Sequence, residues 1–381
     1  MKKFDRDNLE AGLRAARKRD FRSKRRAVKR SHKKSGSRKK LNWDATFNLV
    51  QAPPKLDLYS PKNHNTFVKF LADLRASVKS HSKTLISFRD SHRITASAGL
   101  MLVAETDRLI KAFPNSRIKC SFPPKTVTGK FRVNDRVVEA ALNQIGYFKL
   151  IGQKNHTTSN QASINMWKHL SGQTADGSLA SSLLESISDD ITEIAKKKIY
   201  RGAIEAIANC VEHAYPYPRK DGLAISDKRW WMLVGKDDTN LCIIVCDLGV
   251  GIPETLPRKH PTKLLDQIKH TFGIFDNSDS EMIRAATHLK QTRTKLSNRG
   301  KGGKDFRSIT RNFPTASLII RSNKGAFFIT GEDAEPLPKA STRRFVPDSA
   351  GLESTLEHAL SIHGTLIEWV VPLQDLENDL H

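Results

Sequence analysis

The chain has 381 residues, of which 38% are hydrophobic and 7% aromatic, and its formal net charge is +24. This length suits two ordinary domains, and no apolar run approaches the ~20 residues of a membrane-spanning helix, which excludes a membrane span. No apolar stretch follows the basic N-terminus, so the sequence predicts a cytoplasmic protein without a secretory signal.

Basic residues are concentrated at the N-terminus. Residues 1–40 contain 18 Lys and Arg against 4 Asp and Glu, so they contribute +14 of the net charge. Such a run repels itself and has little to bury, and we expect residues 1–50 to form a disordered arm. A polycation of this kind can bind nucleic acid through counterion release, or acidic lipid, or an acidic protein. The alternative is a solvated tail.

Residues 41–63 are punctuated by proline and asparagine and are predicted to be a linker. A small α/β domain is predicted over residues 64–152, because segments with helical and strand-like patterns alternate there. The helices are expected at 66–80, 97–113 and 137–151, and the strands at 83–88 and 118–122.

The helix at 97–113 begins within the segment ITASAGLML, and this domain resembles a STAS domain. In that family a strand leads into an Asp-Ser-Ser-Gly turn that opens a helix, and anti-anti-sigma members are phosphorylated on the first serine. Ser97 matches that serine, whereas Ala96 and Ala98 stand at the positions of the Asp and the second Ser. The resemblance implies a partner-binding domain with Ser97 as a candidate phosphoacceptor. The alternative is that Ser97 caps the helix.

Residues 151–177 are polar and are predicted to connect to a second domain at 178–381. The patterns there predict two helices within 182–215 and two strands within 227–247. Further along, the expected elements are a glycine-led helix at 301–313, paired strands at 316–322 and 325–330, and a last strand at 364–373.

Three polar residues of the second domain share one helix face. Glu205, Asn209 and His213 recur every four residues in EAIANCVEHAY, a spacing that aligns side chains along a helix. A side-chain amide oxygen on such a face can hold Mg²⁺ against phosphates, because hard cations prefer oxygen ligands. Taken alone, Glu205 could equally pair with Arg201 on the helix surface.

Glycine-rich segments lie at three other points of this domain. Asp247, Gly249 and Gly251 form a D-x-G-x-G sequence after an apolar strand, where glycines let the backbone approach a ligand and bend sharply. Thr365 opens the last strand. The segment NRGKGGKDF leads into a helix whose first amides can face phosphate, and its candidate phosphate ligands are Gly300, Lys301, Gly302 and Gly303.

In this order and spacing the four segments resemble the GHKL ATPase family of histidine kinases, gyrases and heat-shock chaperones. The resemblance implies a two-layer α/β sandwich with a mixed sheet, and ATP and Mg²⁺ as ligands. It assigns the metal to Asn209, activation of water to Glu205, and adenine to Asp247 and Thr365. Lys304 and Asp305 depart from the Gly-Leu of many members. Residues 254–299 match the family's ATP lid, a segment that commonly gates turnover; the alternative is a surface loop with a helix.

The N-box, as the family's first motif is called, ends here in His-Ala-Tyr and looks closest to anti-sigma serine kinases. The resemblance therefore implies an ATPase or a protein serine kinase in partner-switching regulation, with a protein partner. Two alternatives stay open: an ATP-gated binding module that does not hydrolyse ATP, and an ATPase that associates with nucleic acid through the basic arm.

Overall fold

The computed structural model describes most of the chain beyond residue 46. Contacts divide the chain into Met1–Thr46 and one compact unit, Phe47–His381. The described residues are 47–122, 137–154, 166–185, 191–223, 228–293, 307–331 and 353–377. They form a mixed α/β protein with several sheets. The arm predicted at 1–50 lies outside them except for its last four residues.

The N-terminal layer, residues 47–154, carries a parallel sheet in the order β1-β3-β5. Its elements are β1 (Asn48–Gln51), β2 (Lys55–Leu56), α2 (Pro61–Ser80), β3 (Lys83–Ser87), β4 (Arg93–Ile94), α3 (Ala96–Ala112), β5 (Arg117–Ser121), α4 (Val137–Gln144) and α5 (Tyr147–Leu150). The helix predicted over 137–151 is divided at Gly146, whose φ of 73° is a conformation that glycine adopts without steric cost.

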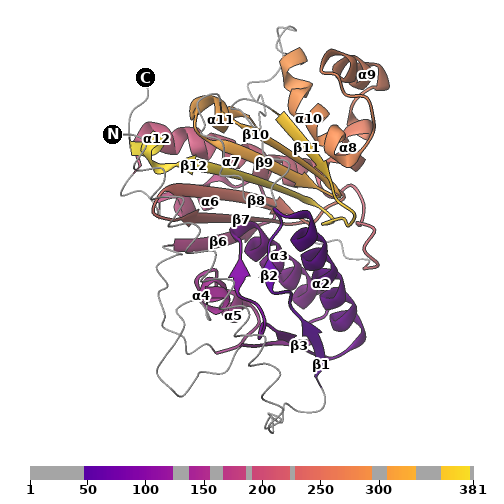
Figure 1. The fold of residues 1–381 in the computed structure, drawn as a ribbon, viewed down its shortest axis with the longest axis vertical. Helices are drawn as coiled ribbons and strands as arrows, with labels where there is room; N and C mark the ends of the chain where they lie inside the picture. The colour runs from indigo at the N-terminus through magenta and orange to yellow at the C-terminus, as the bar shows by residue number, and fades with distance from the viewer. Residues whose placement is uncertain are drawn as a thin grey trace, which may run out of the picture. The chain divides into compact units, whose positions relative to one another are not determined.

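The largest sheet has seven strands in the order β11-β10-β9-β12-β8-β7-β6 (Figure 1). Every pair of neighbouring strands in it is antiparallel, so the expectation of a mixed sheet is wrong for the described strands. Short turns join β7 to β8 and β9 to β10, and such hairpins can join only antiparallel strands. The strands are β6 (Met166–Gly172), β7 (Trp230–Lys236), β8 (Asn240–Asp247), β9 (Ser317–Ser322), β10 (Gly325–Thr330), β11 (Glu353–Glu357) and β12 (Thr365–Pro372).

Segments predicted to be connectors contain strands. β6 falls within residues 151–177 and pairs along its whole length with β7. β1 and β2 fall within residues 41–63, and β1 pairs with β3. The ordered structure therefore begins before His64, and the large sheet begins before residue 178. β1 and β6 are edge strands, and edge strands with many polar residues lack the apolar pattern that identifies buried ones.

Both faces of the large sheet are buried around β7. Trp230, Met232 and Val234 belong to a core shared with α7 (Glu193–His213), whereas Trp231 and Leu233 belong to a core shared with α3. Successive side chains of a strand point to opposite faces, so this strand is covered by α7 on one side and by the N-terminal layer on the other (Figure 1). The segments predicted as separate domains thus share a hydrophobic core.

The remaining helices contribute to the core on the α7 side of the sheet or pack against it. α6 (Gly177–Glu185), α11 (Ser308–Asn312) and α12 (Leu373–Glu377) accompany α7. α8 (Ile252–Lys259), α9 (Thr262–Thr271) and α10 (Asp279–Arg293) follow β8 and include a small core of their own. No helix among the described residues combines the length and the apolar character needed to cross a bilayer.

A stacked histidine pair joins the N-terminal layer to the end of β11. The rings of His64 and His358 are parallel within 3°, with centroids 3.6 Å apart, and the two residues are 1% and 4% exposed. Burial, with a smaller contribution from Arg321, lowers the pKa of His64 to about 4. Burial, with smaller contributions from His64 and Arg321, lowers the pKa of His358 to about 3. Asp57 acts in the opposite direction on His64. Both rings are therefore neutral at pH 7.

This pair predicts loss of stability in mild acid. The unfolded histidines titrate near pH 6.5 and the folded ones lower, so the stabilisation is complete above pH 6.5 and is lost as the pH falls toward 4. We expect the two histidines together to lower the free energy of unfolding by about 5 kcal/mol between pH 7 and pH 4.5. Chemical denaturation of His358→Phe, which keeps the stacked ring, should show a smaller drop than the wild type. His270→Gln, at an exposed position, should behave as the wild type; equal pH profiles for all three proteins would contradict the assignment.

Candidate functional site

A cavity of about 500 Å³ lies where β8 ends and β12 begins, between α7, α8 and α10. We call it the central cavity. Its walls are apolar apart from a few polar groups, and this composition is typical of sites for small ligands. Its lining residues are Ala206, Asn209, Cys210, His213, Ala214, Asp247, Gly251, Ile252, Thr255, Leu256, Lys259, His260, Ala286, Leu289, Thr365 and Ile367.

Helix α7 supplies one wall. Its N-terminus is capped by the Thr192 side chain, which accepts a hydrogen bond from the backbone N–H of Ala195, and its apolar stripe packs on the sheet. Asn209 and His213, one turn apart on the other stripe, line the cavity. Glu205, one turn earlier, is half-buried and does not line it. Its Oε2 is buried and has no hydrogen-bond partner among the described residues.

Asp247 is the buried carboxylate of the cavity, at the last position of β8. It is 4% exposed, and the backbone N–H of Gly249 donates to its Oδ1 at 2.9 Å. Burial raises the pKa of Asp247 to about 6, against hydrogen bonds from Gly249, the Cys210 thiol and Thr365 that lower it. A carboxylate held in this way can accept a hydrogen bond from an amino group that enters the cavity.

Thr365 faces Asp247 across the pairing of β8 with β12. Its hydroxyl lies 3.0 Å from that of Ser322 at the end of β9, and Ser322 Oγ accepts a hydrogen bond of 2.9 Å from the backbone N–H of Ile252. The start of α8, the end of β9 and the start of β12 are therefore tied together at the cavity. Ser322 was not among the residues predicted from the sequence.

The glycines of D-x-G-x-G allow the chain to turn against the end of α7. A Cβ on Gly249 would lie 2.1 Å from the carbonyl oxygen of Ala214, and one on Gly251 would lie 2.7 Å from the Asn323 amide. Gly251 also has a φ of 86°. The backbone N–H of Val250 donates to the Ala214 carbonyl at 2.9 Å, so close approach requires glycine here. Of the two glycines, Gly251 lines the cavity and Gly249 does not.

The segment predicted as a lid, residues 254–299, is described as far as residue 293 and is mostly helical. α8 and α10 contribute Leu256, Lys259 and Leu289 to the cavity wall, and Lys259 Nζ contacts His213 Nδ1. These lining residues were not predicted from the sequence, although the amphipathic pattern of α8 directly after the D-x-G-x-G turn could have indicated them.

One predicted feature falls outside the described residues, and another does not line the cavity. The glycine loop with Gly300, Lys301, Gly302 and Gly303 falls outside the described residues. Ser97 lies in the first turn of α3 with 0% exposure, and its Oγ is 3.3 Å from that of Thr95. Thr95, rather than Ser97, caps the helix by accepting from the N–H of Ala98. A kinase could reach Ser97 only if this turn opened.

A metal ion bound in the cavity would have few protein ligands. Throughout the described ranges, no three His, Cys, Asp or Glu side chains are arranged to hold a metal ion. Mg²⁺ is nevertheless often held by one or two protein oxygens together with phosphate oxygens and water, and the Asn209 side chain fits that requirement.

Comparison with known proteins does not identify a family. Neither the scan of family models nor the search of curated proteins gives a match to this chain.

The ionised Asp247 carboxylate, which could accept a hydrogen bond from a ligand, is predicted to lower the stability of the folded protein. Its pKa is raised from 3.8 to about 6, so the native state binds the extra proton below pH 6, and stability is lost as the pH rises from about 4 to about 6. Asp247→Asn removes this loss. At pH 7.5 the free energy of unfolding of this variant should be about 2 kcal/mol higher than that of the wild type. The two proteins should converge below pH 4 in denaturant titrations. A variant that is less stable at pH 7.5 would contradict the burial argument.

Proposed function

We propose that this chain is a Mg²⁺-dependent ATP-binding protein of the GHKL type. The observation that carries the proposal is the central cavity, which unites residues from three separate sequence motifs: Asn209 and His213, Asp247 and Gly251, and Thr365. These positions are up to 156 residues apart in the sequence. Motif residues that matched by chance would have no reason to meet in one cavity.

The adenine side of the proposal rests on Asp247 and Thr365. An adenine amino group would donate to the Asp247 carboxylate, and the Thr365 hydroxyl would supply a second polar contact. Ile252, Leu256 and Ile367 line the same cavity and would cover the faces of the base. A volume of about 500 Å³ lies within the usual range for small-ligand sites.

The phosphate side rests on α7 and α8. Asn209 would offer its amide oxygen to Mg²⁺, and the bound ion would neutralise phosphate charge. Lys259 and His260 lie at the end of α8 on the cavity wall, where a cationic side chain favours a polyphosphate. The predicted contribution of the glycine loop at Gly300 to Gly303 is part of the same proposal.

Catalysis is assigned to Glu205. Its Oε2 is buried without a partner among the described residues, and it lies one turn from Asn209 on α7. A carboxylate so placed would act as general base toward water or a hydroxyl. With the STAS-like N-terminal layer, this supports an ATPase or serine kinase in partner-switching regulation. Because Ser97 is buried, a partner protein is the better-placed phosphoacceptor.

A second candidate function is an ATP-gated binding module without hydrolysis. The observation that favours it is that Glu205 does not line the central cavity. A ligand that binds open and closed states with different affinity can switch a partner surface without chemistry.

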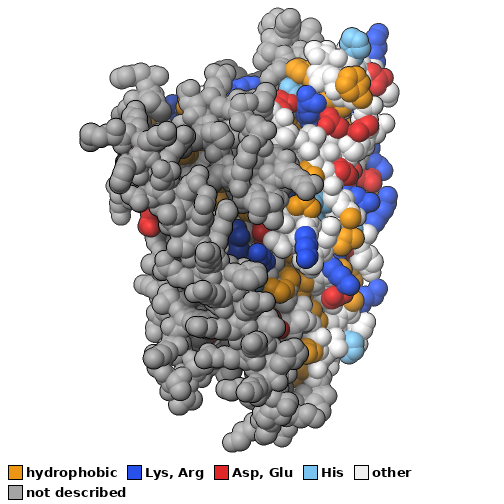
Figure 2. Space-filling model, in the orientation of Figure 1, with side chains coloured by type: hydrophobic (Ala, Val, Ile, Leu, Met, Phe, Trp, Pro, Cys, Tyr) orange, Lys and Arg blue, Asp and Glu red, His pale blue; other side chains and the backbone are white. Residues whose placement is uncertain are grey.

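Association with nucleic acid would depend on the basic arm. On the face drawn in Figure 2, basic and acidic side chains of the described residues are intermixed, without one broad basic patch. Residues 1–40, which hold +14 of the charge, are the segment that we propose for electrostatic binding of a phosphate backbone.

Asn209→Ala tests metal-dependent nucleotide binding. We expect about tenfold weaker ATP binding in the presence of Mg²⁺ and little change in its absence, because the lost group is a metal ligand. Calorimetric titration with ATP and a nonhydrolysable analogue measures both. Asn143→Ala, at an exposed position of α4, is the matched control. Absence of ATP binding by the wild type would overturn the proposed function.

Glu205→Gln separates the two candidates. If the chain hydrolyses or transfers phosphate, turnover should fall about 100-fold or more while ATP binding is retained. Glu193→Gln, in the first turn of the same helix, is the control. Phosphate release and protein labelling are measured with ATP and Mg²⁺. A wild type that binds ATP but shows no Glu205-dependent turnover would support the binding module.

A further inference from the structure

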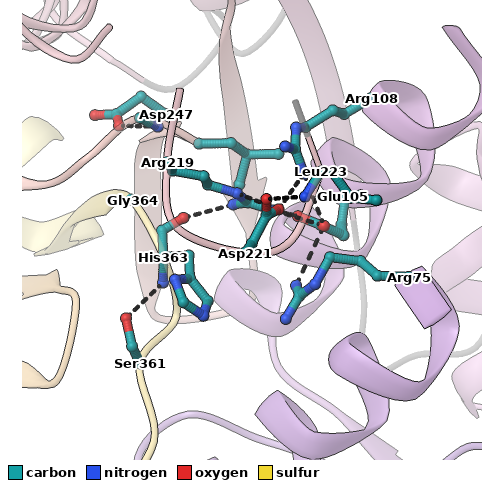
Figure 3. Close-up of polar contacts among 12 residues, drawn as sticks. Arg75, Glu105, Arg108, Arg219, Asp221, Leu223, Asp247, Ser361, His363 and Gly364 are labelled. Atoms are coloured by element: carbon teal, nitrogen blue, oxygen red, sulfur yellow. Dashed lines mark hydrogen bonds and ion pairs between the residues drawn. The ribbon is translucent and has the colours of Figure 1, made fainter. Parts of the chain in front are cut away.

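A buried ionic cluster joins the N-terminal layer to the loop that follows α7 (Figure 3). Glu105 and Arg108 come from α3 and Arg75 from α2, while Arg219 and Asp221 come from the loop. Arg219 Nη2 lies 2.6 Å from both Glu105 carboxylate oxygens, and its Nε lies 2.7 Å from Asp221. Arg108 contacts Asp221 at 2.6 Å and Arg75 contacts Glu105 at 3.2 Å.

The cluster is costly to bury unless it stays intact. The Glu105 side chain is 0% exposed and that of Arg219 is 2% exposed. Burial acts to raise the pKa of Glu105, yet Arg219, Arg75 and Arg108 together bring it below its ordinary value. Removing one partner from such a pair leaves a buried charge uncompensated, which is more destabilising than exchanging both. Glu105 therefore holds Arg219 in one position.

Arg219 has a third contact, with the backbone that leads into the central cavity. Its Nη1 donates to the backbone carbonyl of His363 at 2.6 Å. His363 and Gly364 have φ values of 55° and 136°, and a Cβ on Gly364 would lie 2.3 Å from the Asp247 carbonyl. This unusual backbone leads directly into Thr365, so the guanidinium fixes the turn that aims Thr365 at Asp247.

The other end of the same loop is attached to the D-x-G-x-G turn. The loop begins at Ala214, whose carbonyl accepts the N–H of Val250. Arg219 thus lies between the two backbone segments that shape the base end of the central cavity, although its own side chain does not line that cavity. Its positive charge also favours the ionised form of Asp247 by lowering the pKa of that carboxyl.

We propose that Arg219, anchored by Glu105 of α3, is a positioning residue that sets base recognition in the central cavity. This inference rests on the proposed ATP-binding function. Arg219 acts through the His363 carbonyl and the loop after α7. Because α3 belongs to the N-terminal layer, base binding and the packing of that layer are coupled, and such coupling is reciprocal.

Arg219→Lys and Arg219→Met test the inference against Arg75→Met. Arg75 contacts the same Glu105 from α2 but not His363, so its loss disturbs the cluster and spares the turn. The affinities for ATP and GTP are measured on each protein. We expect both Arg219 variants to lose about tenfold in ATP affinity, with a smaller loss for GTP, because lysine cannot bridge Glu105 and His363 as the guanidinium does. Arg75→Met should keep the wild-type ratio of the two affinities.

The outcomes separate this inference from the proposed function. If the wild type does not bind ATP, both are overturned. The proposed function stands if the wild type binds ATP and Asp247→Asn does not. In that case this inference alone is overturned if the Arg219 variants keep the wild-type ratio of ATP to GTP affinity, or if Arg75→Met loses that ratio equally.

Hydrogen exchange on the wild type keeps the test valid if the Arg219 variants do not fold. ATP should slow amide exchange in residues 219–223 and in α3 around Glu105, and should leave α4 unchanged. Protection that stops at the cavity residues would contradict the coupling.

Discussion

The structure depends on the burial of both faces of the large sheet around β7 and β8. Trp230 and Trp231 are adjacent in the sequence, point to opposite faces and are 0% and 1% exposed. Neither face could be left to water, since burial of large aromatic side chains dominates core energetics. The N-terminal layer therefore serves as the second cover of the sheet. Trp231 Nε1 also donates to Asp107 of α3 at 3.0 Å, so its polar group remains satisfied.

The central cavity follows from this arrangement. The central cavity opens at the end of β8 and the start of β12, where the sheet is bounded by loops. α7 presses its apolar stripe on the sheet and leaves Asn209 and His213 on the cavity side. The glycine turn at Gly249 is held against the end of α7, and the Glu105–Arg219 pair ties the remaining loop to α3. The site is thus assembled from rigid elements, which is the arrangement that orients ligand-binding groups best.

Much of the fold was predictable where the apolar pattern is local and strong. The helices at α2, α3 and α7 and the strands β7 to β10 and β12 match the predicted segments. The edge strands β1 and β6 were assigned to connectors, because polar residues interrupt their apolar pattern. The shared core was missed for a different reason. The continuous apolar run in β7 indicates that both faces of the strand are buried, but not which segment covers each face.

The sequence by itself determined the local features: the helix face with Asn209 and His213, the D-x-G-x-G turn, and the apolar strands that precede Asp247 and follow Gly364. Each depends on spacing within a few residues. The tertiary structure alone decided that these residues share one cavity while Glu205 does not line it, that Ser97 is buried, and that Arg219 pairs with Glu105. That pair is 114 residues apart, and contacts over such separations arise from packing, which leaves no local periodicity to read.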